Sequence, residues 1–115
     1  MIAFRFVRED LNHPHNFKPV KIQQPNRHFD NENTNCIALG LSMFSGKEKE
    51  KDFFRQRLIK FPRFAAIVGN RIAAVSVALE DGVASQPEEL NLGHFTFHEY
   101  LWCDFAKQTI ASEAI

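Results

Sequence analysis

The chain has 115 residues, of which 44% are hydrophobic and 24% charged, and this is the composition of an ordinary globular domain. Lys and Arg together number 14 and so do Asp and Glu, which gives a formal net charge of zero. Because nucleic-acid-binding domains usually carry a basic surplus or a basic stripe, this balance disfavours a nucleic-acid partner.

The length predicts a single domain spanning residues 1–115, since domains of about 100–150 residues are the most common size. The apolar N-terminus turns charged at Arg8-Glu9-Asp10, which is the pattern of neither a signal peptide nor a transit peptide. No apolar run approaches the roughly 18 residues that span a bilayer. Because the two cysteines are widely spaced and the sequence shows no secretion signal, Cys36 and Cys103 are expected to be buried thiols rather than a disulfide. We expect a soluble, cytoplasmic protein without a membrane partner.

Met1–Val7 alternates in the manner of a first strand, on which Arg5 is expected to be an edge-strand charge that points to solvent. Residues 8–35 then hold six Asn, three Pro and three His, and these residues favour turns over ladders. They predict a long irregular loop, interrupted by a short extended piece at residues 20–22 and pinned to the body by Phe17 and Phe29.

Cys36–Phe44 is apolar on both faces, which is typical of a central strand. Ser45–Lys60 follows as the main helix, with Ser45 and Glu48 expected to form a capping box and Phe54 on its apolar stripe. The charged run 47–52 is expected to be a solvated first turn.

Phe64–Val68 and Arg71–Leu79 are predicted to form a hairpin around Gly69-Asn70. Brief pairing at Val83–Ala84 and a strand at His94–Leu101 follow. The tail from Trp102 to Ile110 has the spacing of a short amphipathic helix. The predicted fold is α+β: a small mixed or antiparallel sheet packed against one main helix, with a long irregular N-terminal loop at 8–35.

The strand at residues 94–101 concentrates the possible chemistry of the chain. Strand alternation places four polar residues on one face: His94, Thr96, His98 and Tyr100. Glu99 falls on the other face, among aromatic residues. The two His lie roughly 13 Å apart on a strand, at about 3.3 Å per residue, so no shared metal is predicted. The polar face can line a ligand site, or it can be the solvated face that antiparallel strands normally have.

Other candidate residues lie outside this strand. The loop residues His13, His15 and His28 can fold over it as extra ligands or a lid. Cys103 beside Asp104 is expected to be a structural thiol rather than a nucleophile, because no His is fixed next to it by local spacing. The isolated glycines form no phosphate-binding loop.

Three blocks resemble a group of short bacterial proteins of unassigned function: residues 36–44, 80–83 and 93–100. A looser resemblance is to folds of the ADP-ribosyltransferase type. In those folds an Arg or His stands on the first strand, a Ser or Thr on a strand before a helix, and a Glu on a late strand. Arg5, Ser42 and Glu99 stand at the matching positions, and the resemblance implies NAD as the cofactor.

The leading hypothesis is a small ligand-binding or protein-interaction domain that uses the polar face of residues 94–100 together with Ser42. It predicts no cofactor and no metal, and its partner is an unspecified small molecule or protein. The first alternative is a small enzyme, either an NAD-using group-transfer enzyme or a hydrolase. In it His94 or His98 acts as acid–base and Arg5 binds an anionic group. The second alternative is a structural subunit of a homo-oligomer.

Overall fold

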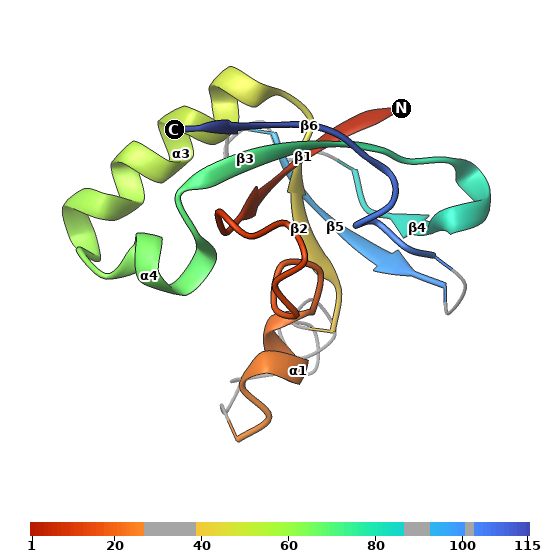
Figure 1. The fold of residues 1–115 in the computed structure, drawn as a ribbon, viewed down its shortest axis with the longest axis horizontal. Helices are drawn as coiled ribbons and strands as arrows, with labels where there is room; N and C mark the ends of the chain where they lie inside the picture. Colours follow the sequence, from red (N-terminus) through yellow and green to blue (C-terminus); the bar gives the residue numbers. More distant parts are fainter. Residues whose placement is uncertain (27–38, 87–92, 101–102) are drawn as a thin grey trace.

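The computed structural model describes residues 1–26, 39–86, 93–100 and 103–115. The strands of this described part are β1 (Ile2–Val7), β2 (Leu41–Phe44), β3 (Arg71–Ser76), β4 (Gly82–Ala84), β5 (His94–Glu99) and β6 (Thr109–Ala114). Its helices are α1 (Val20–Gln23), α3 (Lys47–Lys60), α4 (Phe64–Val68) and the 3-10 turn η1 (Leu79–Asp81). The strands form one antiparallel sheet in the order β4-β5-β2-β1-β3-β6 (Figure 1). The fold is therefore α+β with α3 as its main helix, as predicted.

Helices α3 and α4 cover one face of the sheet, which we call the helix side. Phe6 of β1 meets Phe44 of β2 and Phe54 of α3 there, with 5.5 Å between the ring centroids in each case. Ile72 of β3 completes the buried cluster. Alternation on β1 and β2 sends these side chains to the helix side and their neighbours to the other face.

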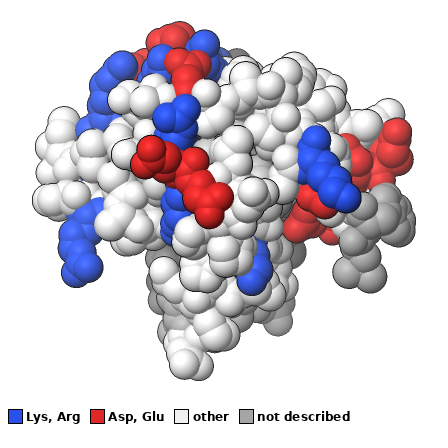
Figure 2. All heavy atoms as spheres, in the orientation of Figure 1, with Lys and Arg blue, Asp and Glu red and all other residues white. Residues whose placement is uncertain are grey.

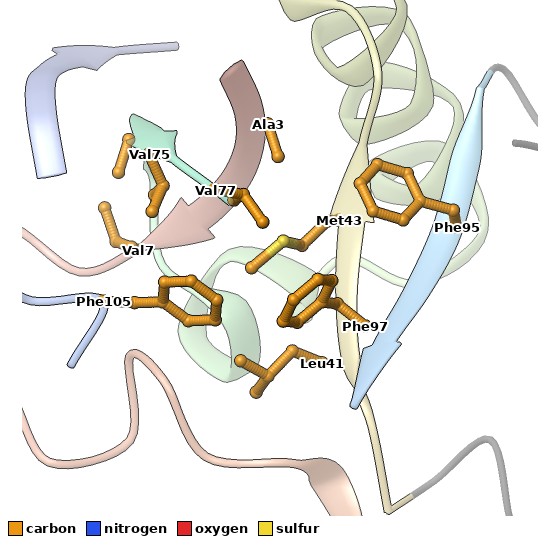
Figure 3. Close-up of a cluster of buried hydrophobic side chains, with 10 residues drawn as sticks. Ala3, Val7, Leu41, Met43, Val75, Val77, Phe95, Phe97 and Phe105 are labelled. Carbon is orange, nitrogen blue, oxygen red and sulfur yellow. The ribbon is translucent and has the colours of Figure 1, made fainter. Parts of the chain in front are cut away.

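The opposite face, which we call the loop side, carries the larger buried cluster. Its members are Ala3, Val7, Leu41, Met43, Ala73, Val75, Val77, Phe95, Phe97 and Phe105. Figure 3 shows side chains of β2 and β5 pointing toward those of β1 and β3, with the Phe105 ring between them. Phe17 packs against this cluster, so its predicted role in pinning the N-terminal segment is confirmed. Phe29 lies outside the described residues.

Strand β1 is a central strand. It pairs with β3 along its whole length, from Ile2↔Ser76 to Val7↔Arg71, and with β2 at Phe4↔Phe44. The prediction that Arg5 is an edge-strand charge was therefore wrong, because strands lie on both sides of it.

Helix α3 begins without the predicted capping box. Gly46 is the N-cap residue and makes no side-chain cap hydrogen bond. The backbone N–H of Ser45 instead donates to Gly93 O at 3.1 Å, which ties the start of the helix to the start of β5. Glu50 in the first turns is fully buried, so the prediction of a solvated turn was wrong at this position.

The predicted hairpin at residues 64–79 was half wrong. Arg71–Ser76 is strand β3, but Phe64–Val68 is the short helix α4. A five-residue apolar run carries too little periodicity to separate helix from strand. Gly69 ends α4 with φ +94 and donates its N–H to Ala65 O at 2.8 Å, and a Cβ there would meet Val7 O at 2.1 Å.

The helix predicted over residues 102–110 was wrong in the described part of this tail. Residues 105–108 form a turn, and β6 then pairs with β3 from Val75↔Thr109 to Arg71↔Ala114, with an irregularity at Ala74/Val75. Joining a sheet edge satisfies the backbone of so short a segment, whereas a short isolated helix is marginal. Glu113 also pairs with Lys47 of α3 at 2.8 Å.

The N-terminal segment is only partly as predicted. Residues 8–19 form turns, but residues 20–23 are the helix α1 rather than an extended piece. The predicted strand Cys36–Phe44 is shorter, since Leu39 and Gly40 precede β2 in a turn and a bend. Residues 27–38 lie outside the described part.

The described surface carries mixed charge. In Figure 2 basic and acidic side chains lie next to one another near the upper left and at the right, and much of the surface between them is uncharged. Among the described residues no helix is both long and apolar enough to cross a membrane.

Candidate functional site

The polar residues of β5 share one face, as strand alternation predicted, and this face is the helix side. Phe95 and Phe97 are buried on the loop side, while His94, Thr96 and His98 are half-buried on the other face. The ladder with β2 puts Ser42 opposite Thr96. The row is therefore packed against a neighbouring strand rather than freely solvated.

His94 forms the chemically most defined contact of this row. Its Nε2 lies 3.0 Å from the Ser42 hydroxyl, and its ring lies nearly parallel to Phe53 at 6.4 Å and edge-on to Phe44 at 5.4 Å. The imidazole can accept the hydroxyl proton or donate to the hydroxyl oxygen, according to its tautomer. Two residues named separately from the sequence thus lie side by side.

The other members of the row are held by close packing. A Cβ built on Gly40 would lie 2.4 Å from Thr96 Cγ2 and 3.0 Å from the His98 ring. The backbone N–H of Thr96 donates to the Ser85 hydroxyl at 2.9 Å. Tyr100 follows the end of β5 and is 40% exposed, so it continues the row at the molecular surface.

Arg5 of β1 connects this strand to β2 and to the N-terminal segment through hydrogen bonds of its guanidinium group. Its Nη1 donates to Ser42 O at 2.7 Å and its Nε to Asn16 O at 2.6 Å, while Nη2 lies 3.5 Å from Lys18 O. Burial lowers the pKa of Arg5 to about 10, and the negative charges of Glu50 and Glu99 raise it. An anionic ligand would therefore compete with main-chain carbonyls for this guanidinium.

Glu50 is a buried acid on the helix side. Neither carboxyl oxygen has a hydrogen-bond partner among the described residues. Burial raises the pKa of Glu50 to about 9, although the Arg5 charge lowers it. The side chain is therefore a neutral carboxylic acid at pH 7. Its helical spacing four residues before Phe54 was a signal for burial that the charged run obscured.

A cavity of about 260 Å³ opens on the loop side, beyond the end of β5. It lies between the turns of residues 11–17 and the segment 103–106, with Glu99 at the end of the strand. Its described lining residues are Leu11, Asn12, His13, Pro14, Phe17, Glu99, Cys103, Asp104, Phe105 and Ala106. His13 and Phe17 from the N-terminal segment thus meet Glu99 on the face opposite the predicted polar row.

Two carboxyl groups share this cavity. Burial raises the pKa of Glu99, the Arg5 charge lowers it and the Asp104 charge raises it again. The sequence placed Glu99 correctly on the aromatic face, but the cavity itself was not predicted. The one sequence feature that marks its position is a single acid at the end of an aromatic stripe.

Cys103 is poorly suited to nucleophilic chemistry. Burial, with the charges of Asp81, Glu99 and Asp104, raises the pKa of its thiol to about 12. The thiol donates to Gln108 Oε1 at 3.5 Å. A thiol that stays protonated at pH 7 agrees with the structural role predicted for it. Cys36 lies outside the described residues.

Among the described residues, no three His, Cys, Asp or Glu side chains are placed to hold a metal ion. His28, Phe29 and Trp102 lie outside the described residues.

Comparison of the chain with models of protein families, with curated proteins and with solved structures gives no match.

Proposed function

We propose that this protein is a small-ligand-binding domain whose ligand occupies the loop-side cavity beside Glu99. The observation that carries the proposal is the half-buried Glu99 carboxyl at the wall of a cavity of about 260 Å³. Ligand sites are typically concave and largely apolar, with a few polar groups that fix orientation. This cavity combines apolar side chains such as Leu11 and Phe17 with the polar groups of Glu99 and Asp104, and its volume lies just below the usual range.

The unfavourable surroundings of the charged Glu99 carboxylate at the cavity wall support the same conclusion. Burial disfavours the charged carboxylate, and Asp104 adds repulsion. A perturbed acid in a cleft is a common mark of a functional site, although ion-pair networks also produce one. Glu99 and the cavity support this function together. Burial removes water from the carboxyl group, and a ligand in the cavity can contact that group instead.

Blocking the cavity tests the proposal. A fragment collection with acidic, neutral and basic members is screened by backbone amide NMR shifts. We expect at least one fragment to shift the amides of Leu11, Phe17 and Ala106. Ala106→Trp fills the mouth from an exposed position and should abolish these shifts. Ala66→Trp, at an exposed position on α4, is the control and should leave them unchanged. Shifts that survive Ala106→Trp, or no shifts at all, would refute binding in this cavity.

The contact between the Ser42 hydroxyl and the His94 ring supports a second candidate function on the helix side. A hydroxyl within hydrogen-bond reach of an imidazole is the arrangement of a nucleophile and its general base. In a group-transfer or hydrolytic reaction His94 would take the proton from Ser42, with His98 as the other acid–base candidate. Hydrolysis of a panel of activated esters by the native chain and by Ser42→Ala tests this role. Equal rates would exclude it.

The NAD-using version of this alternative draws on Arg5 and Glu99, whose charges interact. Two features weigh against it. The Ser42 hydroxyl contacts His94 on the helix side, whereas Glu99 lines the loop-side cavity. A cavity of about 260 Å³ is also small for a dinucleotide. Nicotinamide release from NAD by the native chain, absent in Glu99→Gln, is the result that would support it.

A further inference from the structure

The charge of the loop-side cavity is negative. Glu99 and Asp104 both line it, and no Lys or Arg stands among its described lining residues. Arg5 is the basic residue whose charge reaches Glu99, but its Nε and Nη1 donate to the carbonyls of Asn16 and Ser42. The described lining therefore holds two acids and no basic side chain, and Lys107, which is not among the described lining residues, forms an exposed ion pair with Asp104 at 3.9 Å.

His13 adds an imidazole ring to the lining. The backbone N–H of His15 donates to His13 Nδ1 at 3.1 Å, which leaves Nε2 as the other polar atom of this ring. The lining thus combines two carboxyl groups with one imidazole.

The remainder of the lining is largely apolar. Phe17 and Phe105 stand with their ring centroids 6.1 Å apart, and Phe105 is 1% exposed while Phe17 is half-buried. Leu11, Pro14 and Ala106 complete this part. Such a wall favours an apolar or aromatic body, and aromatic faces also attract cations.

We propose that the ligand is a small organic cation, with its ammonium group between Glu99 and Asp104 and its apolar body against Phe17 and Phe105. This inference rests on the proposed ligand-binding function and names the ligand's chemical class. A cation beside two carboxylates relieves their mutual repulsion. A bound anion would itself be repelled by the two carboxylates, and a neutral ligand would leave the repulsion between them unchanged. At about 260 Å³ the cavity suits a single ring with a short amine.

Three probes of nearly the same size separate the charge of the ligand from its shape: benzylamine, benzyl alcohol and benzoate. Each is titrated into the native chain at pH 7 and low ionic strength, and amide shifts of Leu11, Phe17 and Ala106 give the dissociation constants. We expect benzylamine to bind about tenfold more tightly than benzyl alcohol, and benzoate most weakly. Added salt should reduce the advantage of benzylamine.

Two acidic positions locate the effect. Glu99→Gln and Asp104→Asn each remove one charge from the cavity, and each should reduce benzylamine affinity about fivefold while leaving benzyl alcohol unchanged. Glu48→Gln removes the same charge from an exposed site on α3, on the helix side, and should change neither affinity. If one cavity variant fails to fold, the other carries the test.

The outcomes separate this inference from the function on which it rests. If benzyl alcohol or benzoate binds in the cavity as tightly as benzylamine, the cation class is wrong and ligand binding stands. If benzylamine binds equally well to the native chain, Glu99→Gln and Asp104→Asn, the acids do not recognise it and the inference fails. If no probe binds and no fragment of the wider screen binds either, both the inference and the proposed function fail.

Discussion

Each side of the sheet holds a glutamate that is partly or fully buried, and the surroundings of the two carboxyl groups differ. Glu50 belongs to α3 on the helix side and is fully buried, and neither carboxyl oxygen has a hydrogen-bond partner among the described residues. Glu99 on the loop side is half-buried at the wall of a cavity. Arg5 interacts electrostatically with both. A fully buried carboxyl group without a partner destabilises the fold, whereas a carboxyl group beside a cavity can be paired with a bound ligand.

The same contrast runs along β5 itself. Its helix-side face carries most of the polar side chains, yet these are occupied by contacts with Ser42, Phe53 and Gly40. Its loop-side face is aromatic until Glu99, where the strand leaves the core and meets the cavity. A concentration of polar residues on a strand therefore does not locate a cavity. The place where an apolar stripe leaves the core is a better guide.

Phe97→Ala should cause the largest loss of stability and would show which face of β5 holds the fold together. Phe97 is 2% exposed and its ring centroid lies 5.4 Å from that of Phe105. We expect a loss of about 3–5 kcal/mol in the free energy of unfolding, measured by urea denaturation, because a large cavity replaces the ring. Thr96→Ala on the opposite face should cost about 1 kcal/mol or less. Equal losses would contradict this comparison.

Glu50→Met should stabilise the protein and remove part of its pH dependence. The pKa of Glu50 is about 9 in the folded state against 4.5 for an ordinary Glu, so the folded state holds its proton between these values. The contribution of Glu50 to the stability of the fold is therefore fully present below about pH 4.5 and is lost as the pH rises through 9. At pH 8 we expect Glu50→Met to gain about 1–4 kcal/mol, the range by which replacing a buried ionic group with a hydrophobic residue often stabilises a protein.

The control for Glu50→Met is Glu48→Met, at an exposed position on the same helix. It should leave both the stability and its slope between pH 5 and 9 nearly unchanged. Urea titrations across this pH range measure both quantities. A Glu50→Met chain with the native slope would show that the Glu50 carboxyl is already ionised and paired in the folded protein.

Arg5→Met should disturb both sides of the sheet at once. It leaves the Asn16 and Ser42 carbonyls without their donor and should cost about 2 kcal/mol. Because the Arg5 charge lowers the pKa of Glu99, its removal should raise that pKa, which carbon-13 NMR of the carboxyl measures. Arg63→Met, at an exposed position, is the matched control. An unchanged Glu99 pKa would remove the link between Arg5 and the cavity.

Ser42→Ala should have the smallest effect. It removes the hydroxyl that lies 3.0 Å from His94 Nε2, and one such hydrogen bond contributes about 0.5–1 kcal/mol. Urea denaturation measures the loss, with the exposed Ser76→Ala as the comparison. A loss above about 2 kcal/mol would mean that the polar row is a buried network rather than a surface feature.

Local periodicity determined much of this protein. Alternation fixed which residues of β1, β2 and β5 share a face, including the separation of Glu99 from His94. The spacing of Phe54 and its neighbours predicted α3, which ends at Lys60 as expected, whereas the start was placed two residues early from a capping box that does not form. These features depend on residues a few positions apart, so the sequence carries them directly.

Tertiary contacts decided the rest. Residues 64–68 became a helix and residues 109–114 a strand because of what each could pack against or pair with, and their short apolar patterns fit either structure. Arg5 became a central bridge because β3 and β2 both flank β1. The cavity exists only because His13 and Phe17, near one end of the chain, meet Asp104 and Phe105, near the other. No local pattern records a meeting of distant segments, since it depends on the packing of the whole sheet.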